Sequence, residues 1–148
     1  MKRYSSKQSG FTLLEIMVVI VILGILASMV LPNLLGNKDQ AERQKVVSDI
    51  TTLEGAMQMY YLNNSIYPTT DQGLEALVEK PEIDPVPRNY REDGYIQRLP
   101  DDPWGNPYML LSPGENGKFD IFSAGRDREE GTDDDIGNWN MHDKPEQQ

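Results

Sequence analysis

The sequence predicts an α+β fold in which one long N-terminal helix packs on a small antiparallel β-sheet. Two observations favour this fold. An apolar run near the start leads into a polar stretch whose apolar residues recur with a helical period. Nearer the C-terminus, short apolar segments are separated by Pro and Gly, as in strands joined by turns. The 148 residues leave room for one modest domain beyond the apolar run.

The apolar run covers residues 11–31, and its exceptions to large apolar side chains are Thr12, Glu15, Gly24 and Ser28. About 20 apolar residues cross a bilayer as a helix, so we expect a transmembrane helix over residues 11–32. The basic residues of segment 1–10 favour the cytoplasm, which places residues 33–148 on the other side of the membrane. An acidic side chain costs about 2.5–3.5 kcal/mol at the centre of a membrane helix. Glu15 lies near the end of the run, where the cost is smaller, but it still requires a positive partner.

A cleaved secretory signal peptide is the alternative for this start. The run is longer than the usual apolar region of about 7–15 residues in such peptides. Ile25 and Leu26 also make a poor cleavage site around Ala27 and Ser28. We therefore expect the run to be retained as a membrane anchor.

The composition disfavours several classes of function for the domain that follows the apolar run. The formal net charge is −10, which disfavours nucleic-acid binding because phosphates are neutralised by clustered Lys and Arg. The chain has no Cys, so disulfides do not hold this exported domain together. It also has a single His and no Gly-rich phosphate loop after a strand, so we predict that it is not an enzyme. The paired Asp101 and Asp102 precede Pro103, where a role in a turn is expected.

Beyond Leu35 the helical pattern resumes. A stripe of apolar residues is spaced by three and four positions, namely Val46, Ile50, Leu53, Met57 and Tyr60. This pattern predicts an amphipathic helix that continues the membrane helix to about residue 62. Two separate helices meeting at Pro32–Gly36 are the alternative, because proline tends to kink a helix.

After this helix, Thr69 and Gln72 have the spacing of a capping box and predict a short helix over residues 71–79. The Pro-rich segment from 80 to 107 is expected to be an ordered loop, because a disordered linker has little use for aromatic rings such as Tyr90 and Tyr95. Trp104 in this segment is expected in the core.

Three short segments read as strands, residues 108–112, 118–123 and 136–140. The alternation in the second segment predicts a strand buried on one face, with Phe119 and Ile121 inside. Trp139 is expected in the core, and the tail from Met141 is expected to fray.

An acidic loop separates the last two predicted strands. Its carboxylates at Asp127, Asp133, Asp134 and Asp135 flank a glycine-containing turn. Calcium binds six to eight oxygens, from carboxylates and backbone carbonyls, so these residues are candidate Ca²⁺ ligands, although their spacing is not that of an EF-hand. A solvated acidic turn is the alternative.

The start of the chain resembles the class III signal of the type IV pilin and pseudopilin superfamily. The resemblance rests on the basic leader followed by Gly10, Phe11, Thr-Leu-Leu, Glu15 and the apolar run. It implies a leader peptide of residues 1–10, cleavage after Gly10 by a membrane aspartic peptidase, and methylation of the new N-terminus at Phe11. It also implies that Glu15 meets the terminal amine of a neighbouring subunit, which supplies the missing positive partner.

Four further stretches are similar to the major pseudopilins of type II secretion, the general secretion pathway protein G family: YPTTDQGLEAL (67–77), LPDDPWGNPY (99–108), FDI (119–121) and DIGNW (135–139). The resemblance implies a pilin-like fold whose C-terminal loop is held by calcium rather than by a disulfide. Asp127 and Asp135 match the family's ligand positions best, and the choice between Asp133 and Asp134 stays open.

The resemblance also implies a function and its partners. The subunit is expected in the bacterial inner membrane as a single-pass precursor with its domain in the periplasm, and later in a periplasmic filament that helps to export folded proteins across the outer membrane. Expected partners are other copies of the chain, minor pseudopilins, the prepilin peptidase/N-methyltransferase, the inner-membrane assembly platform and, before assembly, membrane lipid.

Two other functions are alternatives. A type IV pilin for adhesion or DNA uptake is disfavoured by the missing cysteines and by the acidic loop. The other is a membrane-tethered calcium-binding module that does not polymerise.

Overall fold

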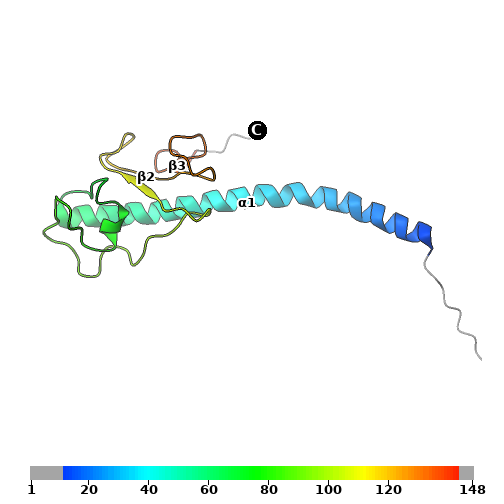
Figure 1. Cartoon of the computed structure of the whole chain (residues 1–148), viewed down its shortest axis with the longest axis horizontal. Helices are drawn as coiled ribbons and strands as arrows, with labels where there is room; N and C mark the ends of the chain where they lie inside the picture. Colours follow the sequence, from blue (N-terminus) through cyan, green and yellow to red (C-terminus); the bar gives the residue numbers. More distant parts are fainter. Residues whose placement is uncertain (1–11, 144–148) are drawn as a thin grey trace, which may run out of the picture. The chain divides into compact units, whose positions relative to one another are not determined.

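The computed structural model describes residues 12–143, without the side chains of residues 29–37. Its elements in chain order are α1 (Leu13–Asn64), the 3-10 turn η1 (Leu74–Leu77), β1 (Met109–Leu111), β2 (Asp120–Ser123) and β3 (Ile136–Gly137) (Figure 1). The three strands form one antiparallel sheet with β2 in the centre. The predicted combination of a long N-terminal helix and a small antiparallel sheet is confirmed.

The chain divides into two compact units between Gln40 and Ala41, and α1 contributes to both. α1 is one helix that includes residues 32–36. The alternative of two helices meeting at Pro32–Gly36 is therefore wrong. The two units are described separately below.

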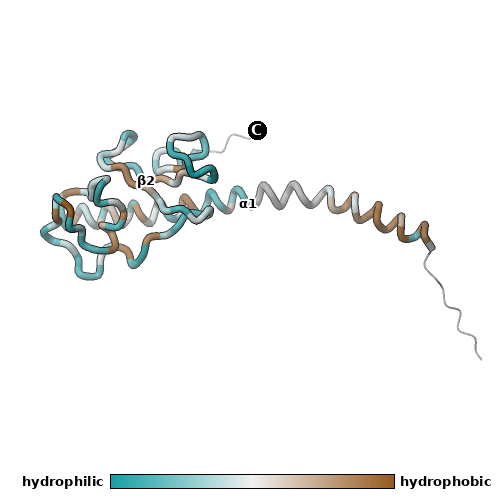
Figure 2. The backbone as a smooth tube through the Cα atoms, in the orientation of Figure 1, coloured by the Kyte–Doolittle hydropathy of each residue, from teal (hydrophilic) through white to brown (hydrophobic). Residues whose placement is uncertain are grey.

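The first unit presents apolar side chains to its surroundings. Between Leu13 and Leu26, the large apolar side chains of α1 are exposed by fractions from 46% at Ile16 to 81% at Leu13. Figure 2 shows this stretch as the most hydrophobic part of the helix. No helix within the described residues is both long enough and apolar enough to span a membrane.

In the second unit, the predicted stripe of α1 is fully buried. Val46, Ile50, Leu53, Met57 and Tyr60 each have 0% exposure. They form the core together with side chains from the sheet and from η1, among them Leu74, Leu77, Leu110, Ile121 and Ile136. The helical period of the sequence therefore identified the main contact surface of this unit.

The central strand differs from the prediction. Asp120, Ile121, Phe122 and Ser123 are all buried, so the expectation of a strand with one exposed face is wrong. The reason is that β2 is covered on both sides. Ile121 faces the core on α1, whereas Phe122 packs against the ring of Trp139, with 5.7 Å between the ring centroids. The strands are also shorter than predicted, above all β3.

The connection after α1 contains the predicted capping box. The amide of Gln72 donates to Thr69 Oγ1 at 3.3 Å, and the amide of Thr69 donates to Gln72 Oε1 at 3.1 Å. However, only four residues of the expected helix over 71–79 are helical, and they form the 3-10 turn η1. The other polar side-chain atom of Gln72, Nε2, donates to the carbonyls of Ile83 and Pro85, at 2.6 and 3.1 Å, and so anchors the Pro-rich loop.

Aromatic rings hold this Pro-rich loop on the end of α1. Tyr60 contacts Tyr90 and Tyr95, with ring centroids 6.2 and 5.2 Å apart. Asn64 Nδ2 donates to the hydroxyl of Tyr95 at 2.9 Å. Tyr90, Tyr95 and Trp104 all pack against the core, so the prediction of an ordered loop is confirmed.

Two expectations for the C-terminal end are wrong. Met141 is 7% exposed, and its amide donates to the carbonyl of Gly137 at 2.9 Å, so the chain does not fray at this residue. Trp139 is 40% exposed and is not a core ring. Its ring lies over Gly137, where an added Cβ would come within 2.2 Å of it. Trp139 therefore covers the end of the sheet from outside.

Candidate functional site

The first candidate site is the start of α1. Gly10 and Phe11 lie outside the described residues. Glu15 lies in the first turn of the helix, and its amide donates to Thr12 Oγ1 at 3.2 Å. This is the contact of an N-cap residue with the third helical position. The positive end of the helix dipole also favours a carboxylate in the first turn. The local structure therefore fixes the backbone at Glu15 and leaves its side chain exposed.

The sequence contains a signal for this cap. Thr12 and Glu15 have the Thr-x-x-Glu spacing of a capping box. Thr69 and Gln72 have the same spacing and form the reciprocal capping box described above. Thr12 is therefore a structural residue of this site and more than an interruption of the apolar run.

The second candidate site is the acidic loop between β2 and β3, residues 124–135, where Asp134 organises the backbone. Asp134 Oδ2 accepts hydrogen bonds from the amides of Arg126 and Asp127, at 2.8 and 3.2 Å. Its Oδ1 accepts from the hydroxyl of Thr132 at 2.6 Å. The hydrogen bond from Thr132 is the main cause that holds the pKa of Asp134 below its usual range. The bonds from the amides of Asp127 and Arg126, and an interaction with the Asp127 side chain, lower this pKa further. The start and the end of the loop are thus joined through Asp134.

The other aspartates of the loop differ in their surroundings. Asp135 is buried; its Oδ2 accepts from the amide of Gly131 at 2.7 Å, while its Oδ1 has no hydrogen-bond partner among the described residues. Asp127 Oδ1 accepts from the amide of Glu129 at 2.9 Å. Asp133 is exposed. An unpartnered buried carboxylate oxygen is costly, so Asp135 Oδ1 is the atom in this loop that most needs a cation or a donor.

The donor chemistry of the loop suits calcium, which prefers carboxylate and carbonyl oxygens. Within the described residues, however, no three carboxylate, His or Cys side chains are gathered as a metal-binding group. The structure brings Asp134 to the backbone of Asp127, and it leaves Asp133 at the surface. The four predicted ligands therefore share a loop but do not form a closed cage.

Gly125 is required by this arrangement. Its φ is +66°, in the left-handed region that disfavours side chains, and an added Cβ would lie 2.3 Å from Asp134 Oδ2. A glycine here allows the Asp134 carboxylate to accept hydrogen bonds from the amides of Arg126 and Asp127.

Asp102 holds a separate turn next to β2. It is 4% exposed, and its Oδ1 accepts from the amides of Trp104 and Asn106, at 3.0 and 2.8 Å. Its Oδ2 accepts from the hydroxyl of Ser123 at 2.6 Å. The predicted turn role of this aspartate is confirmed, and its additional link to Ser123 of β2 has no local signal in the sequence.

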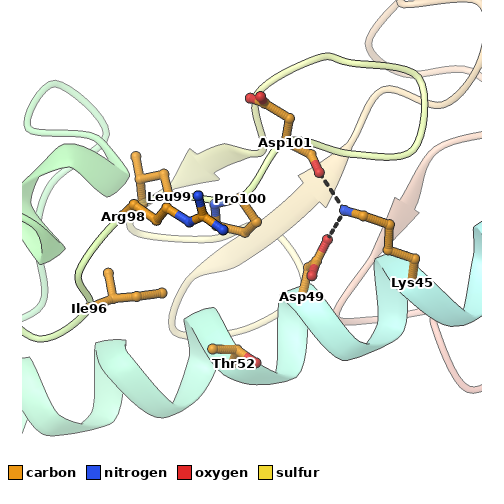
Figure 3. A pocket seen from close by; sticks show the side chains of 8 residues that line it. All are labelled: Lys45, Asp49, Thr52, Ile96, Arg98, Leu99, Pro100 and Asp101. Atoms are coloured by element: carbon orange, nitrogen blue, oxygen red, sulfur yellow. Dashed lines mark hydrogen bonds and ion pairs between the residues drawn. The ribbon is translucent and has the colours of Figure 1, made fainter.

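A cleft of about 470 Å³ lies between α1 and residues 96–101 (Figure 3). Lys45 at its edge donates to Asp49 Oδ2 at 2.6 Å and to the carbonyl of Asp101. The hydroxyl of Tyr108 donates to the same carboxylate oxygen of Asp49, at 2.8 Å. Polar contacts at the edge of this cleft therefore join α1 to the start of the turn at Asp102, and the Lys45 side chain remains 48% exposed.

Comparisons with known proteins agree with this architecture. The family model described as type II secretion system (T2SS), protein G, matches residues 33–139, and the prokaryotic N-terminal methylation motif matches residues 5–31. The chain belongs to the type II secretion system protein G family. The second match contains Gly10, Phe11 and Glu15, the residues of the first candidate site.

Relatives within this family are similar over nearly their whole length. The chain is 69% identical over 137 residues to the type II secretion system core protein G of Aeromonas hydrophila, which covers 93% of this chain and 96% of that protein. It is 61% identical over 142 residues to the core protein G of Escherichia coli K12, covering 96% and 98%.

A solved structure in the family has the same fold. The crystal structure of the major pseudopilin from the type 2 secretion system of enterohaemorrhagic Escherichia coli matches with a TM-score of 0.70 and 62% identity. The match covers 73% of this chain and 95% of that one. The pilin-like fold expected from the sequence is therefore confirmed.

Proposed function

We propose that this protein G family member is a structural subunit of a periplasmic pseudopilus that serves type II secretion. The observation that carries the proposal is the exposed apolar half of α1, residues 13–26, in a chain that belongs to a pseudopilin family. Apolar surface gains about 25 cal/mol per Å² when it leaves water. Such a helix requires either lipid or other protein around it, and a subunit that moves from membrane to fibre uses each in turn.

The N-terminal residues supply the processing and assembly steps of this proposal. The precursor is anchored by residues 11–32 in the inner membrane, with the basic leader in the cytoplasm. The prepilin peptidase/N-methyltransferase cleaves after Gly10 and methylates Phe11. Cleavage creates a positive amine four positions before Glu15, at a similar depth in the bilayer. Two copies offset along a fibre axis can then neutralise each other's charges.

The work of the fibre is mechanical. Subunits added from the membrane extend the fibre at its base, and the growing fibre helps to push folded proteins through an outer-membrane channel. The inner-membrane assembly platform adds the subunits, minor pseudopilins are further members of the fibre, and the energy comes from a separate cytoplasmic ATPase.

We also propose that one Ca²⁺ ion is bound by the acidic loop. Asp127, Asp134 and Asp135 are the principal candidate ligands, with Asp133 as a further candidate. The unpartnered Asp135 Oδ1 and the approach of Asp134 to Asp127 support this assignment. When bound, the ion would neutralise carboxylates that otherwise repel each other, and backbone carbonyls of the loop would complete its coordination.

Co-production of the chain with its peptidase tests the fibre. Mass spectrometry of the product is expected to show a methylated Phe11 as the N-terminus, and electron microscopy is expected to show filaments. A processed subunit that stays monomeric under conditions in which a related pseudopilin polymerises would contradict the proposal. The calcium ion is tested separately by the unfolding temperature with and without a chelator; an unchanged temperature would refute a structural ion.

A further inference from the structure

We infer that Glu42 and Arg43, two consecutive residues of α1, are positioning residues that hold both ends of the acidic loop 124–135. The inference rests on the proposed calcium loop for its consequence, but the contacts themselves do not require an ion. All the groups involved belong to the second unit of the chain.

The first contact holds the beginning of the loop. Arg126 Nη2 lies 2.8 Å from Glu42 Oε2, and the Glu42 side chain is only 12% exposed. The backbone amide of the same Arg126 donates to Asp134 Oδ2 at 2.8 Å. Arg126 therefore links α1 to a candidate metal ligand: its side chain contacts Glu42, and its backbone amide contacts Asp134.

The second contact holds the end of the loop indirectly, through Asn140. Arg43 Nη2 donates to the carbonyls of Asn140 and Asp143, each at 3.0 Å. Asn140 in turn donates from Nδ2 to the carbonyl of Asp135 at 3.0 Å, and its Oδ1 accepts from the amide of Gly137 at 2.9 Å. Arg43 thus fixes the segment that fixes Asp135.

These two routes have a common consequence. The loop carries six acidic side chains and two arginines between residues 126 and 135, so its own charges favour an open conformation. Attachment at both ends to adjacent residues of α1 restricts this opening and keeps the Asp134 carboxylate at the amides of Arg126 and Asp127 before any ion arrives. Less conformational freedom of the loop then has to be lost on binding, which increases its affinity for an ion.

Hydrogen exchange of the calcium-free full-length chain in detergent tests the positioning role. Glu42→Gln is expected to raise the exchange rate of the Arg126 and Asp127 amides roughly 2- to 5-fold, the range of partly exposed ion pairs. Arg43→Met, which keeps the aliphatic stem, is expected to raise exchange at Gly137 and Met141 by a similar factor. Unchanged exchange at these amides in both variants would overturn the inference.

Two further variants distinguish positioning from a general loss of stability. Lys45→Gln removes a charge from the same helix whose contacts are with Asp49 and Asp101, so exchange in the acidic loop is expected to stay at the wild-type rate. The double variant Glu42→Arg with Arg126→Glu restores an ion pair with reversed charges and is expected to restore slow exchange at Asp127. A Lys45→Gln effect on the loop as large as that of Glu42→Gln, or no rescue by the double variant, would contradict a specific clamp.

Calorimetric titration with CaCl₂ then measures the consequence. The dissociation constant of Glu42→Gln and of Arg43→Met is expected to rise roughly 2- to 5-fold, although neither residue is a ligand. Equal affinity in wild type and both variants would overturn the effect on binding. If the wild type binds no calcium, the proposed ion fails, and the exchange rates still decide whether Glu42 and Arg43 hold the loop.

Discussion

The two halves of α1 differ in what they require from their surroundings. In the second half, one apolar stripe from Val46 to Tyr60 is buried to 0% exposure by residues of the same chain. In the first half, apolar side chains between Leu13 and Leu26 remain exposed. The same helical backbone thus serves a folded domain and a segment that needs an external partner. The difference teaches that the domain can be stable by itself, whereas the N-terminal half acquires its proper environment only in lipid or in an assembly.

The largest expected effect comes from Glu15→Ala. In the proposed pairing, the amine created at Phe11 would lack its partner without this carboxylate, so filaments are expected to be lost while membrane insertion and cleavage continue. Filament yield by electron microscopy and cleavage by mass spectrometry measure the two steps separately.

Thr12→Ala is the matched control for Glu15→Ala. It removes the side-chain cap of Glu15 but keeps the carboxylate, and N-cap substitutions cost only about 1 kcal/mol. Filaments are expected to form with reduced yield. Normal filaments from Glu15→Ala would show that charge pairing is not required.

The next largest effect is expected in the buried second half of α1. Leu53→Ala removes a fully buried side chain of the stripe, and such changes cost about 2–5 kcal/mol. The unfolding temperature of the second unit is expected to fall strongly, with processing after Gly10 unchanged. Leu62→Ala, at a position that is 72% exposed on the same helix, is the control and is expected to leave the temperature nearly unchanged.

A smaller effect is expected in the acidic loop from Gly125→Ala. The left-handed conformation costs an L-residue about 1–2 kcal/mol, and the added Cβ would also displace Asp134. Gly131→Ala has a positive φ as well, of +84°, but nothing within 4 Å of the added Cβ. Thermal unfolding of both variants isolates the contact with Asp134; equal destabilisation would mean that this contact contributes nothing.

The smallest expected effect is a dependence on pH. The folded state lowers the pKa of Asp134, so its charged form stabilises the loop above the unfolded pKa of about 3.9. This contribution is lost as the pH falls through the lower pKa of the folded state. NMR shifts of the Arg126 and Asp127 amides are expected to change over this acidic range, and Asp134→Asn is expected to abolish the change. A titration that persists in Asp134→Asn would assign it to another group.

The sequence was most informative where a local structure requires certain residue types at a fixed spacing. The stripe of α1 and the capping box at Thr69 and Gln72 follow from spacing alone, and both are confirmed. β2 was less predictable because alternation reports one buried face, and the sequence does not reveal that Trp139 covers the other. Trp139 itself was expected in the core, but the absence of a Cβ at Gly137 lets its ring lie over the sheet with 40% exposure.

The candidate site was only partly predictable for a related reason. The aspartates of the acidic loop stand out by composition, and a family resemblance selects among them. Their attachment to Glu42 and Arg43 spans more than 80 residues of sequence, and nothing local in the chain indicates such a contact. The role of Asp102 in binding Ser123 was hidden in the same way.

The central claim is that neighbouring copies cover the exposed apolar half of α1 in a fibre. An electron cryo-microscopy structure of fibres sheared from cells tests it most directly. The account predicts that residues 13–26 are packed against the same segment of other copies, with Glu15 beside the amine of a neighbouring Phe11. Fibres held together only by the second unit, with residues 13–26 uncovered by other copies, would contradict it.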